Sequence, residues 1–211
     1  MNNTTHKIFF IPLVGIGLFV LSYIIAAIGY LGGSTVQPTS QYFHLLENYW
    51  CDLFGKTALN SQPNTVQELA LIATSLLCAS IAVFWYSLPK YFLPSPPIYK
   101  TIQYTGLISM FLALGVMTAF HDIAILVSSL FSGIALLLTF SQLFKYQYYK
   151  LLVFGLFSSV LSAMNFIVYY SEWGIAGLPL LQKITFIAFL TWFGMMSLLA
   201  LRNGNIDLLK K

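Results

Sequence analysis

Residues 123–144 read IAILVSSLFSGIALLLTFSQLF, and no charged side chain interrupts them. About 20 apolar residues in a helix, each advancing about 1.5 Å, cross a hydrocarbon core of about 30 Å. Five other stretches of this kind occur in the chain, at residues 8–31, 66–88, 101–120, 151–170 and 180–201. The sequence therefore predicts an all-α, polytopic integral membrane protein in which residues 1–211 form a single domain, a bundle of six transmembrane helices.

The composition excludes other broad classes of protein. Of the 211 residues, 58% are hydrophobic and 8% are charged, whereas a soluble domain carries about 25% charged residues. These proportions exclude a soluble domain, a disordered chain and a nucleic-acid-binding protein. We expect no disulfide bond, because Cys51 lies in a polar connection and Cys78 lies halfway along an apolar stretch.

The positions of the charges predict the orientation of the bundle. With six spans, eight of the ten basic residues fall on the side of the two termini, and five of the six acidic residues fall on the other side. The basic residues on the terminal side are Lys7, Lys90, Lys100, Lys145, Lys150, Arg202, Lys210 and Lys211. Because loops rich in Lys and Arg stay in the cytoplasm, we expect both termini to be cytoplasmic and the protein to lie in a bacterial inner membrane or its equivalent. Membrane lipid is then its main partner, and no nucleic acid is expected.

The first outer loop has the spacing of an amphipathic helix over residues 40–54. Bulky apolar residues recur there at helical intervals, and so do the polar residues of a second stripe. The polar stripe consists of His44, Glu47, Asn48, Cys51 and Asp52. We expect a short interfacial helix that covers the mouth of the bundle as a lid; the alternative is that its polar stripe only faces water.

Ionisable residues at the membrane edge are the default candidates for chemistry, and the catalytic candidates here are His121, Asp122, Glu68 and Asp52. Asp122 also suits the N-cap of a helix that begins at Ile123. Glu68 also suits a capping box with Thr65, unless Asn64 is the cap and leaves Glu68 free for other work. His121 has no such structural role, and its surroundings predict a proton relay or a weak metal site.

A divalent metal is the one cofactor that the sequence leaves open, with His44, Glu47 and His121 as candidate ligands. Neither His-x-x-x-His nor His-Glu-x-x-His occurs in the chain, so no cofactor is predicted outright. A ligand cleft at the outer mouth would be lined by Trp50, Asn48, Asn165 and Glu172.

Small and hydroxylated residues recur at helical spacing in the fourth and fifth apolar stretches. They are Ser128, Ser129, Ser132 and Gly133 in one and Gly155, Ser158, Ser159 and Ser162 in the other. Such faces allow close helix packing, either within one bundle or between two copies of the chain in a homo-oligomer.

The segment 50–55 (Trp-Cys-Asp-Leu-Phe-Gly), the later Asn64 and the turn at residues 118–122 carry a family resemblance. They resemble a large group of uncharacterised prokaryotic six-span membrane proteins whose first outer loop holds a Ser-Asp-Leu-Gly element, with Cys51 in the place of the Ser. That group is similar in layout to the FRAG/DRAM/Sfk proteins of eukaryotes, some of which are implicated in lipid-anchor remodelling. The resemblance implies a six-span fold and marks Asp52, Asn64 and His121 as positions of importance.

Two functions are compatible with these features. The first is a lipid-handling membrane protein whose acidic outer cleft receives the polar head of an amphiphile. The alternative is a metal-assisted hydrolase that cleaves a lipid ester or amide at the outer leaflet, since a bound metal lowers the pKa of its water to about 7. The chain is less similar to alkaline ceramidase-like hydrolases, because it lacks a seventh span and their later His pairs. Whether the protein is an enzyme is left open by the sequence.

Overall fold

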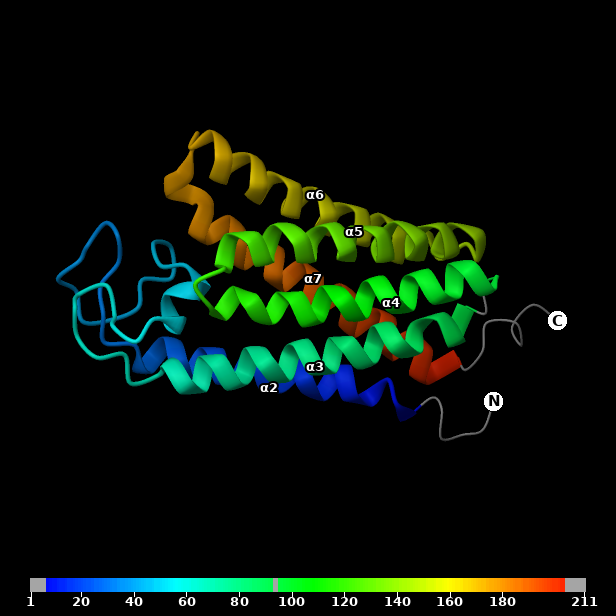
Figure 1. Ribbon diagram of the computed structural model, residues 1–211, viewed down its shortest axis with the longest axis horizontal. Helices are drawn as coiled ribbons and strands as arrows, with labels where there is room; N and C mark the ends of the chain where they lie inside the picture. The colour runs from blue at the N-terminus through cyan, green and yellow to red at the C-terminus, as the bar shows by residue number, and fades with distance from the viewer. Residues whose placement is uncertain (1–6, 93–94, 204–211) are drawn as a thin grey trace.

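The computed structural model describes residues 7–92 and 95–203, which contain six long α-helices (Figure 1). They are α2 (Phe10–Gly29), α3 (Gln67–Phe92), α4 (Pro96–Ala113), α5 (His121–Lys145), α6 (Tyr149–Ser171) and α7 (Leu178–Asn203). Three short 3-10 helices, η1 (Trp50–Phe54), η2 (Leu114–Met117) and η3 (Ile175–Gly177), lie in the connections. Within the described residues the only β-type pairing is an isolated bridge between Thr57 and Pro63.

Among residues 7–92 and 95–203, five helical segments are long and apolar enough to cross a membrane: α2, α3, α5, α6 and the segment Ile175–Arg202, which joins η3 to α7. With many large apolar side chains exposed on their surfaces, the chain is an all-α, multi-pass membrane protein. The helix predicted at 101–120 has different bounds in the structure, where it is α4. It begins at Pro96, because Pro is favoured in the first turn of a helix, and it tightens into η2 after Ala113.

Two glycines let the helices approach closely. A Cβ added at Gly106 of α4 would overlap the indole of Trp85 on α3. A Cβ added at Gly155 of α6 would lie 2.6 Å from the Phe140 ring on α5 and 2.7 Å from Nε1 of Trp192 on α7. These contacts bring aromatic rings of α3, α5 and α7 into one core.

The connection between α2 and α3, residues 30–66, forms a layer over one end of the bundle, which we call the loop end (Figure 1). Acidic Glu68 and Asp122 lie in the first turns of α3 and α5 at the loop end. Basic Lys90, Lys145 and Arg202 lie in the last turns of α3, α5 and α7 at the opposite end, where α2 also begins. The charges are therefore segregated by end, as the sequence predicts; Lys210 and Lys211 lie outside the described residues.

The interfacial helix predicted at 40–54 is wrong over its first ten residues. Only η1 forms, and residues 40–49 are turns and irregular backbone. The cause is local competition, because polar side chains of the segment bond to nearby backbone groups instead of facing water. Asn48 Oδ1 accepts from the N–H of His44 (2.8 Å), and Asp52 Oδ2 accepts from the N–H of Tyr49 (2.9 Å).

Candidate functional site

Asn48 is the centre of the loop layer, and its side chain is fully buried. Its Nδ2 donates to the carbonyl of Gly33 (2.8 Å) and to Oδ2 of Asp52 (2.9 Å). Together with the bond that Oδ1 accepts from His44 N–H, every polar group of the amide is satisfied. Asn48 therefore ties the start of the loop, its middle and η1 together.

Asp52 sits in a partly dry environment within this layer. Burial raises the pKa of its carboxyl group above the ordinary value of 3.8. The hydrogen bonds from Asn48 and from the Tyr49 N–H oppose this shift, as does the positive charge of Lys183. Asp52 is thus held by donors inside the protein.

Lys183, in the second turn of α7, is buried to 4% exposure beneath the loop layer. Its Nζ donates to the carbonyl of Asn48 and to that of Pro179 (3.1 Å). The same ammonium lies 5.5 Å from the ring centroid of Phe43 and 5.3 Å from that of Trp50. Carbonyls and aromatic faces, which both attract cations, therefore enclose it.

Trp50 anchors η1 between the parts of α2 and α7 that lie at the loop end. Its backbone N–H donates to Oε1 of Gln182 (3.1 Å), and its ring packs edge-on to Tyr23 of α2 with centroids 5.1 Å apart. On the α3 side, Nε2 of Gln67 donates to the carbonyl of Phe54 (2.8 Å). These contacts fix η1 at the loop end of the bundle, where it forms a 3-10 turn in place of the predicted interfacial helix.

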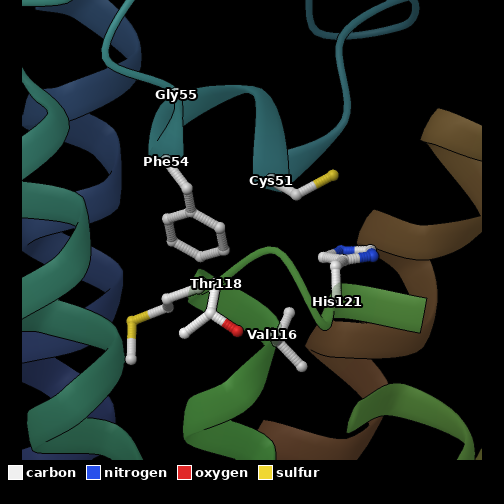
Figure 2. A pocket seen from close by; sticks show the side chains of 7 residues that line it. Cys51, Phe54, Gly55, Val116, Thr118 and His121 are labelled. Atoms are coloured by element: carbon white, nitrogen blue, oxygen red, sulfur yellow. The ribbon is translucent and has the colours of Figure 1, made fainter. Parts of the chain in front are cut away.

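A recess of about 380 Å³ opens between η1 and the turn that leads from η2 into α5 (Figure 2). Phe54 and Val116 point into it, and Met117 adds to this apolar wall. Its polar wall consists of Thr118, His121, Cys51 and the backbone of Gly55. The recess is therefore amphipathic, with apolar and polar groups facing the same space.

His121 reaches the recess from the first residue of α5. Its Nδ1–H donates to Oδ1 of Asp122 (2.9 Å), and the hydroxyl of Tyr169 on α6 donates to Oδ2 of the same carboxylate (3.2 Å). The N-cap role expected for Asp122 is wrong, because α5 begins one residue before Asp122 and its carboxylate binds these side chains instead. The result is a chain of three polar side chains that joins α5 to α6.

His44 and Glu47 form a separate cluster on the loop. Oε2 of Glu47 accepts from the hydroxyl of Ser34 (2.5 Å) and lies 3.8 Å from Nδ1 of His44. Nε2 of His44 is buried and has no hydrogen-bond partner in the structure. Within the described part of the chain, no three His, Cys, Asp or Glu side chains are placed to hold a metal ion, so His44, Glu47 and His121 do not assemble into a ligand set.

Asn64, rather than Thr65, organises the start of α3. Its Oδ1 accepts from the N–H of Val66 (3.2 Å), and its Nδ2 donates to the carbonyls of Leu53 (2.9 Å) and Gly55 (2.8 Å). Glu68 is exposed in the first turn of α3, as the alternative cap at Asn64 allows.

The four residues expected to line a ligand cleft do not line the recess. Asn165 donates to Oγ1 of Thr185 (2.7 Å) and so joins α6 to α7, while Glu172 is exposed in a left-handed conformation after α6. Trp50 and Asn48 hold the loop layer together. The recess is lined instead by Cys51 and His121, together with the apolar side chains described above.

Sequence reasoning missed Lys183 and Gln182 as partners of the loop. Lys183 is the only charged residue within the last apolar stretch before Arg202, and that isolation was the available signal. Cys51 was placed on the polar stripe of the predicted helix but was not singled out as a site residue, and the structure puts it in the recess from η1 instead.

No family model, no curated protein and no solved structure matches the chain.

Proposed function

We propose that the chain crosses the membrane six times and handles lipid, with the recess beside η1 receiving the polar head of an amphiphile. The observation that carries the proposal is the amphipathic recess of about 380 Å³ at the loop end. This volume lies within the range of about 300–1,000 Å³ that is typical of small-molecule sites. It suits a headgroup and the first part of a chain rather than a whole lipid.

The sixth crossing is α4 with η2. The 18 residues of α4 advance about 27 Å and the 4 residues of η2 about 8 Å, which together exceed the hydrocarbon thickness. In Figure 1, α4 lies alongside α3 and α5 for the length of the bundle. Both neighbours are candidate spans, so α4 shares their depth.

The segregation of charge supports an orientation with the loop end outside. Lys90, Lys145 and Arg202 lie at the opposite end, and the positive-inside rule favours the cytoplasmic side for an end rich in Lys and Arg. The recess then opens at the level of the outer headgroups. A tail that leaves the recess meets exposed apolar side chains of α5, such as Ile123 at 63% exposure.

The test uses the purified protein in detergent and a lysophosphatidylethanolamine that carries a fluorescent NBD group on its acyl chain. Val116→Trp fills the recess and should weaken binding at least tenfold. The matched control is Val160→Trp, since Val160 is 57% exposed on α6 and does not line the recess. Equal binding by both variants and the unaltered protein would overturn the proposal.

A further inference from the structure

The recess brings a thiol and an imidazole to one space. Cys51 enters it from η1, and His121 enters it from the first turn of α5 (Figure 2). In that view the sulfur of Cys51 points to the side of the recess where the imidazole lies. The two side chains are 70 positions apart in the sequence, so only the fold makes them neighbours of one recess.

The imidazole of His121 is held at the recess by a neighbouring carboxylate. Its Nδ1–H is held by Oδ1 of Asp122 at 2.9 Å, and Tyr169 holds the other carboxylate oxygen. With the proton on Nδ1, Nε2 is the basic nitrogen and can accept a proton. A nucleophile, a base and a carboxylate that fixes the tautomer of the base are the three parts of nucleophilic acyl transfer.

We propose that the recess is an acyl-transfer site, in which Cys51 is the nucleophile, His121 is the general base and Asp122 is the positioning residue. The substrate class is a fatty acyl ester or thioester at the outer leaflet. The inference rests on the proposed function, because the amphiphile must first bind in the recess. The apolar wall of Phe54, Val116 and Met117 holds the start of the acyl chain.

In the first step, the sulfur of Cys51 attacks the acyl carbonyl carbon while its proton passes to Nε2 of His121. The bond between the acyl carbon and the leaving oxygen or sulfur breaks, and His121 returns the proton to that leaving group. In the second step, a hydroxyl compound, either water or a lipid alcohol, attacks the thioester. Its proton passes through His121 to the sulfur, and the thiol is restored without any oxidant or reductant.

The environment of Cys51 makes the base necessary. Burial, together with the neighbouring carboxyl of Asp52, raises the pKa of its thiol to about 12. At neutral pH the resting sulfur is therefore protonated, and its proton must leave as the new bond forms. A thiol that was already ionised at neutral pH would need no general base, whereas the thiol of Cys51 does.

The experiment uses the full chain in detergent micelles with p-nitrophenyl decanoate as the acyl donor. Nitrophenolate release measures the rate, and mass spectrometry locates the acyl group. We expect a thioester on Cys51 that neutral hydroxylamine removes, and its absence in Cys51→Ala. Cys78→Ala is the matched control, because Cys78 is the only other cysteine and lies buried in α3.

The base and the positioning residue are tested separately. A general base contributes about 10²- to 10⁴-fold to the rate, so His121→Gln should slow acylation at least 100-fold. Asp122→Asn should lower kcat and leave KM unchanged, and Asp122→Glu should restore part of the rate. A merely structural role for Asp122 would raise KM and lower the thermal midpoint instead.

The NBD-lysolipid assay separates the two proposals. A wild-type protein that binds the lysolipid but forms no thioester overturns acyl transfer and leaves the lipid site standing. Equal rates for His121→Gln and the wild type also overturn it, because the adduct would then report only an accessible thiol. A protein that binds no lysolipid overturns both proposals.

Discussion

Replacing Lys183 with Met removes the buried ammonium and keeps a side chain of similar length. The carbonyl of Asn48 then loses its donor while it stays buried, at a cost of about 1–3 kcal/mol. The carbonyl of Pro179 is still bonded within the helix, so it adds little. Each lost contact with Phe43 and Trp50 costs about 0.5–1 kcal/mol, and relief of the buried charge offsets part of the total.

The net effect is a loop layer that docks about 2 kcal/mol less tightly, which corresponds to about 30-fold more frequent opening. Hydrogen exchange of peptides from residues 43–55, followed by mass spectrometry, measures this opening directly. Lys56→Met is the matched control, because Lys56 belongs to the same loop and is exposed. Exchange in Lys183→Met that stays within threefold of the wild type, or an equal rise in Lys56→Met, would refute the reasoning.

Three further outcomes are expected. Because the folded-state pKa of Asp52 is raised, its contribution to stability is fully present below pH 3.8 and is lost as pH rises through the raised value. The thermal midpoint of the wild type relative to that of Asp52→Asn should therefore increase when the pH is lowered from 7 to 4. A difference in thermal midpoint that stays constant over this range would contradict the shift. Asn165→Leu should lower the unfolding free energy by about 0.6–2 kcal/mol in a titration in mixed detergent micelles, since it removes the hydrogen bond from α6 to Thr185 of α7. An unchanged unfolding free energy would mean that this bond does not form. Gly106→Ala should cost about 1–3 kcal/mol of unfolding free energy by the same titration, because its methyl group overlaps Trp85. Gly133→Ala has open space around the new methyl group and should be neutral or slightly stabilising. A larger loss of stability in Gly133→Ala than in Gly106→Ala would exclude this packing.

The helical architecture could be predicted because lipid imposes a simple rule on sequence. A segment that crosses hydrocarbon must satisfy its own backbone and expose apolar side chains, and both demands are visible in the stretch 123–144. The structure has α5 at His121–Lys145, close to that expectation. The starts of other helices agree less evenly: α3 begins at Gln67, one residue after its predicted start, whereas α4 begins at Pro96, five residues before its predicted start.

The loop layer could not be predicted in the same way, because its contacts are not periodic. Asn48 and Asp52 lie at helical spacing, yet their side chains bond to backbone groups and prevent the helix that the spacing favours. Lys183 gave a local signal, an isolated charge in an apolar stretch. Its partner is 135 positions earlier in the chain, and no local pattern contains that information.

The same separation has a consequence for the order in which the protein is made. The part of the loop that reaches η1 leaves the ribosome soon after α2. Gln182 and Lys183, which bind it, are synthesised more than 130 residues later. Until α7 enters the bilayer, the carbonyl of Asn48 lacks the ammonium of Lys183 and the N–H of Trp50 lacks the side chain of Gln182. The loop layer therefore completes its contacts last, and in a nascent chain arrested before α7 we expect proteases to cut this loop more readily than in the finished protein.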